Sequence, residues 1–189
     1  MKKIILPAAI LMALSISFNS AAQQNVLIEE LPRLSEIEFN TIENNQSERI
    51  IREAATQAPD QYSIIILSGD NTINKQNTAR WLAQKINVPI YRVNLLQVVS
   101  MNFEEIQRDL NIIFEEAKNK NRVLFFDEGD ALFGNRTGVT DNHDKYDNEA
   151  INYFSDQVEK YKGSTIISVT ASNNINPLVF EKYVRFIIH

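Results

Sequence analysis

The residues best suited to chemistry stand at the end of an apolar run. Residues 123–126 are all apolar and lead directly into Asp127 and Glu128. A carboxylate at the carboxyl end of a strand can reach a metal-bound water, and a second carboxylate beside it can orient an attacking water. Many nucleoside triphosphatases hold magnesium and activate water in this way. Asp127 is therefore the candidate metal ligand, and Glu128 is a candidate catalytic residue.

The same pair of carboxylates also has a structural interpretation. Asp127 could end its strand by capping a turn, and Asp130 and Arg136 could pair with the two carboxylates. The residues alone leave the catalytic and structural interpretations open.

A second candidate is a loop that would bind the phosphates of a nucleotide. Such loops follow the pattern G-x-x-x-x-G-K-[ST] between a strand and a helix. The matching segment, and the candidate cofactor-binding set, consists of Gly69, Asp70, Asn71, Thr72, Ile73, Asn74, Lys75 and Gln76. The first glycine and the lysine of the pattern are in place.

Three residues of this loop weaken the pattern. Asn74 replaces a glycine, so a side chain occupies space near the anion, although Asn tolerates left-handed backbone angles. Gln76 replaces the residue whose hydroxyl binds magnesium, and Asp70 adds a negative charge where phosphates would lie. A loop that binds no nucleotide is thus as consistent with the residues as a cradle for ATP. We expect ATP and magnesium to bind weakly or not at all.

The elements that must position these residues alternate between strand and helix. Continuous apolar runs are typical of strands buried on both faces, and apolar residues at helical spacing lie between them. Strands are predicted over 63–68, 89–93, 122–127, 165–170 and 184–188, and helices over 75–86, 103–118 and 148–161. We expect a loop at 69–74 and another at 137–145. This alternation predicts an α/β fold, a three-layer αβα sandwich around a parallel five-stranded sheet.

The beginning of the chain has the features of an export signal. Lys2 and Lys3 precede an apolar stretch over residues 4–18, and small residues end at Ala22, which predicts cleavage after Ala22. An uncleaved anchor or a buried helix is the alternative. We expect a periplasmic or secreted protein with no stable membrane span after cleavage. The expected organisation is a signal peptide over 1–22, an arm and a helix over 23–59, and an α/β domain over 60–189.

Charge and cysteine content exclude some classes of function. The formal net charge is −5, which argues against a nucleic-acid partner, because nucleic-acid binding requires a basic face. The chain has no cysteine, so disulfides and thiolate chemistry are excluded.

Taken in order, the segments from about residue 60 onward resemble an AAA+ ATPase domain. The strongest match surrounds Asp127 and Glu128 and includes Asp130 and Arg136. The segment 168–173 is similar to the strand that ends in the sensor asparagine of the family. The resemblance thus implies that Asn173 is a catalytic residue that senses the γ-phosphate. The matching segments are 75–83, 89–94, 98–100, 103–118, 125–136, 168–173 and 176–178.

The chain departs from that family where a subunit would complete its neighbour's site. The region of the arginine finger aligns with Glu181, Lys182 and Tyr183, and Lys182 cannot form the planar fork of a guanidinium. We also expect the helical lid domain of the family to be missing. Our leading hypothesis is an exported, degenerate AAA+-like domain that acts mainly by binding a protein partner.

Two alternatives remain. One is an ATP-binding protein with weak or partner-dependent hydrolysis, and the other is an exported enzyme that acts on a different phosphorylated ligand. The oligomeric state stays open.

Overall fold

The computed structural model describes residues 28–45, 64–99, 102–134, 143–171 and 184–188. The helix expected near residues 47–58, the expected signal at 1–22 and the candidate residue Asn173 all lie outside this part of the chain. In the described residues, no helix is long and apolar enough to cross a membrane.

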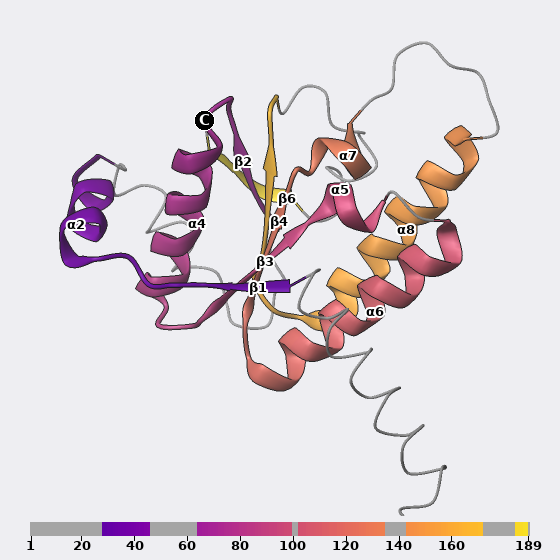
Figure 1. The fold of residues 1–189 in the computed structure, drawn as a ribbon, viewed down its shortest axis with the longest axis horizontal. Helices are drawn as coiled ribbons and strands as arrows, with labels where there is room; N and C mark the ends of the chain where they lie inside the picture. Colours follow the sequence, from indigo (N-terminus) through magenta and orange to yellow (C-terminus); the bar gives the residue numbers. More distant parts are fainter. Residues whose placement is uncertain (1–27, 46–63, 100–101, 135–142, 172–183, 189) are drawn as a thin grey trace, which may run out of the picture.

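A six-stranded sheet in the order β1-β3-β4-β5-β2-β6 forms the middle layer (Figure 1). Its strands are β1 (Ile28–Leu31), β2 (Ile64–Ser68), β3 (Ile90–Asn94), β4 (Val123–Asp127), β5 (Thr165–Val169) and β6 (Val184–Ile188). The five predicted strands are confirmed and run parallel to one another. The additional strand, β1, pairs antiparallel with β3 and was not predicted.

Helices cover both faces of this sheet. On one face lie α5 (Leu95–Val98), α6 (Phe103–Lys120), α7 (Asp130–Phe133) and α8 (His143–Tyr161). The other face carries α4 (Thr72–Lys85), with α2 (Glu36–Asn45) outside it. Figure 1 shows α6 and α8 side by side and α4 and α2 on the opposite side of the sheet. The predicted three-layer αβα architecture is therefore confirmed.

The helix α6 shows why this arrangement forms. Asn102 caps its first turn by accepting a hydrogen bond from the Glu105 amide at 3.0 Å, and Asn121 ends it in a left-handed conformation. In the apolar stripe of α6, Leu110 and Ile113 are fully buried, and Phe103 in the first turn is partly buried. Periodicity and capping thus agree with the tertiary structure.

The segment before the α/β core is more ordered than the sequence suggested. Only an arm was expected before the helix near residues 47–58, yet residues 28–31 form a strand and residues 36–45 form a helix. Arg80 of α4 holds the connection between β1 and α2 by donating hydrogen bonds to the Pro32 carbonyl at 2.8 Å and the Arg33 carbonyl at 3.1 Å. Leu34 is buried beside them. These tertiary contacts override the weak local signal.

A second prediction was wrong in its boundary. The loop expected over 137–145 extends too far, because α8 already begins at His143.

Candidate functional site

The candidate site lies where the carboxyl ends of β2, β4 and β5 meet the first turns of α4. In a parallel sheet the carboxyl ends of the strands lie along the same edge. The strand order reverses beside β2, because β3, the next strand in sequence, lies beyond β5 and β4. Ligands of open α/β sheets bind at such a reversal of strand order. The fold therefore brings the phosphate-loop-like segment and Asp127 to the same place, as the sequence predicted.

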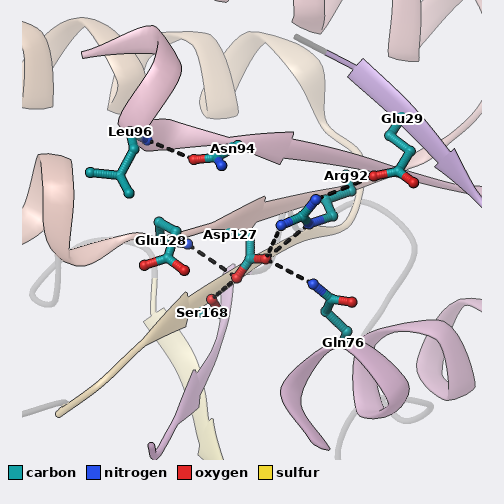
Figure 2. Close-up of polar contacts among 8 residues, drawn as sticks. All are labelled: Glu29, Gln76, Arg92, Asn94, Leu96, Asp127, Glu128 and Ser168. Carbon is teal, nitrogen blue, oxygen red and sulfur yellow. Dashed lines mark hydrogen bonds and ion pairs between the residues drawn. The ribbon is translucent and has the colours of Figure 1, made fainter. Parts of the chain in front are cut away.

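Asp127 is the centre of the polar contacts at this edge (Figure 2). Its side chain is only 1% exposed. One carboxylate oxygen accepts hydrogen bonds from the Ser168 hydroxyl at 2.5 Å and the Glu128 amide at 3.1 Å. Burial would raise the pKa of Asp127, but hydrogen bonds from Ser168, Gln76 and Arg92, together with the charge of Arg92, hold it below its ordinary value. Asp127 is thus a stable buried anion.

The other oxygen of Asp127 is occupied by two neighbouring side chains. Arg92 Nε lies 2.9 Å and Arg92 Nη2 lies 2.8 Å from Oδ2, and Gln76 Nε2 donates to the same atom at 3.1 Å. Arg92 comes from β3, which pairs with β4 directly. Sequence analysis assigned Arg92 only to a strand. The signal that could have indicated this ion pair is an arginine among the apolar residues of a strand that precedes a strand ending in Asp.

These partners leave Asp127 a poor magnesium ligand. Magnesium needs carboxylate oxygens or hydroxyls with free lone pairs in octahedral geometry. Here both oxygens of Asp127 already accept hydrogen bonds, and the side chain at the hydroxyl position, Gln76, presents a donor. The described residues also contain no group of three or more His, Cys, Asp or Glu side chains able to hold a metal. The residues present do not fit the metal that the sequence suggested.

The phosphate-loop-like segment has become the start of a helix. The loop was expected to run to Asn74, but α4 begins at Thr72 and includes Thr72, Ile73 and Asn74. Asn71 caps it, because its side chain accepts from the Asn74 amide at 3.0 Å and its carbonyl accepts from the Lys75 amide at 3.1 Å. Amides that would face a phosphate therefore have partners within the chain.

The residues at the two ends of this segment also have internal partners. The Lys75 ammonium donates to the Val169 carbonyl at 3.0 Å. The Gly69 amide lies 3.1 Å from the carbonyls of both Val169 and Thr170. Gly69 has a φ of +141°, a conformation that favours glycine, while Asp70 beside it is exposed. Gly69 and Lys75 are thus bonded to the end of β5 and to the residue after it.

Glu128 is held at the rim of the site by an unusual backbone conformation. Its φ is +58°, in the left-handed region that non-glycine residues seldom adopt. The next residue, Gly129, packs so tightly on β5 that a Cβ would lie 2.6 Å from both the Ile167 Cγ2 and the Ser168 carbonyl oxygen. In Figure 2 the Glu128 carboxylate and Gln76 lie on opposite sides of Asp127. Glu128 is partly exposed and remains placed to contact a ligand.

The structure pairs Asp127 with residues other than those that the structural alternative named. Asp130 accepts a hydrogen bond at 2.7 Å from the amide of Thr170, the residue directly after β5. Arg136 lies outside the described residues. The cation that pairs with Asp127 is Arg92, which sequence reasoning missed together with Ser168 and Glu29.

The strand order, the phosphate-loop-like segment and the strand-end aspartate define an α/β domain of the P-loop nucleoside-triphosphatase type. A family model described as ATPase family associated with various cellular activities (AAA) matches residues 65–186. This match spans more than half of the chain, and the chain therefore belongs to the AAA family.

A similar solved structure supports the same fold. The structure of the E. coli MS115-1 HORMA:CdnC:Trip13 complex contains a chain with a TM-score of 0.56 and 15% identity. The alignment covers 87% of this chain and 70% of that one. No curated protein matches the chain.

Proposed function

We propose that this chain is an exported, degenerate AAA-family domain that acts by binding a protein partner and not by hydrolysing ATP. The observation that carries the proposal is the state of Asp127, whose carboxylate is held by Arg92 and Gln76. In a hydrolase of this fold that carboxylate serves the magnesium ion of the nucleotide. Here the carboxylate of Asp127 pairs instead with Arg92 of the neighbouring strand β3.

The first turns of α4 support the absence of turnover. An ATP complex would need the amides of Asn74 and Lys75 for phosphate, and both are bonded to the capping Asn71. It would also need the Lys75 ammonium to leave the Val169 carbonyl. Each exchange replaces a formed hydrogen bond, so the net gain from phosphate is small.

Protein binding is the function that such a rigid scaffold can retain. The similar E. coli structure is, by its title, a complex of HORMA, CdnC and Trip13. The shared fold in a complex of proteins supports a protein partner for this chain as well. Export is supported by the basic, apolar and small-residue pattern of residues 1–22.

A second function, ATP binding with weak or partner-dependent hydrolysis, is favoured by one observation. Lys75, Gln76, Asp127 and Glu128 lie together at the edge where such chemistry would occur, and Glu128 is partly exposed. This alternative requires Arg92 and α4 to rearrange before nucleotide can bind.

Calorimetric titration of the chain from residue 23 onward with ATP and magnesium separates the two. Lys75→Ala removes the ammonium at the site, and Lys118→Ala, on the exposed side of α6, is the matched control. We expect the wild type to bind ATP with a millimolar dissociation constant or not at all, and we expect neither substitution to change this binding. Micromolar binding lost in Lys75→Ala and kept in Lys118→Ala would establish the ATP-binding alternative.

Export has its own measurement. Mass spectrometry of the protein from its native cells should find a chain that begins at Gln23 in the exported fraction. A chain that begins at Met1 in the cytoplasmic fraction would refute the export part of the proposal.

A further inference from the structure

A continuous chain of charged side chains links the candidate site to the N-terminal strand. Arg92 contacts Asp127 Oδ2 through Nε and Nη2, and its third nitrogen, Nη1, lies 3.2 Å from Glu29 Oε2 on β1 (Figure 2). Glu29 and Arg92 are direct partners in the antiparallel pairing of β1 with β3. All three guanidinium nitrogens of Arg92 are therefore engaged.

We propose that Arg92 is a built-in counter-cation that closes Asp127 to divalent metals, and that Glu29 of β1 holds Arg92 in this position. The inference rests on the proposed function, because it explains how the site came to be closed. It goes further in assigning a controlling role to β1, the antiparallel strand at the edge of the sheet.

The burial gradient along the chain of charges fits this role. The side chain of Asp127 is 1% exposed, that of Arg92 is 25% exposed and that of Glu29 is 61% exposed. A buried carboxylate needs a cation and hydrogen bonds to remain charged. The planar fork of Arg92 supplies both at once, whereas a metal ion would supply the positive charge and coordinate the oxygens.

Access of a metal to Asp127 then depends on moving Arg92. A divalent cation at Oδ2 would displace the two Arg92 contacts and the Gln76 contact. The ion pair with Glu29 opposes that movement from the far end of the side chain. Weakening the Glu29 contact, or detaching β1 from β3, should therefore make Asp127 more accessible.

Binding of Mn²⁺ alone, with no nucleotide, tests this inference by the electron paramagnetic resonance of the free ion. Four proteins, each beginning at residue 23, are compared: wild type, Arg92→Ala, Glu29→Gln and the control Lys118→Gln. Lys118 is exposed on α6, and its replacement removes one positive charge, as the replacement of Arg92 does. Each is also made with Asp127→Asn, which identifies the binding that depends on Asp127.

We expect wild type and Lys118→Gln to bind Mn²⁺ only weakly and at sites that do not depend on Asp127. Arg92→Ala should bind Mn²⁺ at least about tenfold more tightly than wild type, and Asp127→Asn should abolish the gain. Glu29→Gln should show a smaller gain of about two- to threefold, because Arg92 keeps its contacts with Asp127.

Two results would overturn the inference. One is Mn²⁺ binding by wild type that Asp127→Asn removes, since the site would then already be open. The other is equal binding by wild type and Arg92→Ala. If Arg92→Ala does not fold, Glu29→Gln provides the test, because the Glu29 carboxylate is mostly exposed and its replacement should not prevent folding. Mn²⁺ binding by Glu29→Gln equal to that of wild type would refute the role of β1. ATP titration remains independent, so the proposed function can fail while Arg92 still excludes metal.

Discussion

Replacing Arg92 by methionine should destabilise the domain by leaving a buried charge without its cation. Removing one partner of a buried ion pair costs about 3–5 kcal/mol. The Arg92 side chain is 25% exposed, so water compensates part of this loss, and we expect about 2–3 kcal/mol. Methionine keeps much of the apolar stem, which isolates the loss of the guanidinium. In thermal unfolding this corresponds to a fall of roughly 5–10 °C.

The chain has a single tryptophan, Trp81, which is fully buried on α4 and reports unfolding in urea by its fluorescence. The decisive quantity is the coupling energy from the cycle formed by wild type, Arg92→Met, Asp127→Asn and the double variant. We expect a coupling of at least about 1.5 kcal/mol, since loss of Arg92 should cost little once Asp127 is neutral.

The control Lys118→Met, at an exposed position of α6, should cost less than about 0.5 kcal/mol. A loss below about 0.5 kcal/mol in Arg92→Met, or a coupling near zero, would refute the assignment of Arg92 as the essential counter-cation.

Three further changes test other parts of the site. The pKa of Asp127 is lowered in the folded state, so its contribution to stability is present above the ordinary value of 3.8 and is lost as pH falls through the folded value. Urea unfolding between about pH 6 and pH 3 should show the advantage of wild type over Asp127→Asn shrinking as pH falls, and a pH-independent difference would contradict the pairing. Asn71→Ala should cost about 1 kcal/mol by removing the cap of α4, measured by the same unfolding, and an unchanged midpoint would argue against the helical start at Thr72. Gly129→Ala should cost about 1–3 kcal/mol, because a Cβ there meets β5 at 2.6 Å, and a neutral result would mean that β4 and β5 are not held so closely.

The parallel sheet could be predicted because its strands are buried on both faces. Continuous apolar runs such as residues 64–67 and 123–126 have few other interpretations, and α6 carries its apolar stripe with an asparagine cap. The start of α4 was misplaced because Asn71 can cap a helix as well as occupy a loop, and motif register favoured the loop.

The unpredicted features all depend on contacts between segments distant in sequence. The strand β1 is polar at Glu29 and Glu30, and it is stabilised through pairing with β3 and through Arg92 and Arg122. Nothing local indicates such a strand. Similarly, the pairing of Arg92 with Asp127 requires the register of β3 against β4, which no sequence motif encodes.

The position of Asp127 explains how one carboxylate can suit both an active and an inactive member of this fold. Burial at the end of β4 makes a nearby cation necessary, whatever its source. Magnesium brought by a nucleotide compensates the charge of Asp127 only while the nucleotide is bound. A guanidinium on the adjacent strand compensates that charge at all times. Under the proposed function, Arg92 compensates the charge of Asp127 without nucleotide, so loss of nucleotide binding leaves that carboxylate paired. The proposal thus assigns the retained aspartate to the stability of the fold, with Arg92 as its partner.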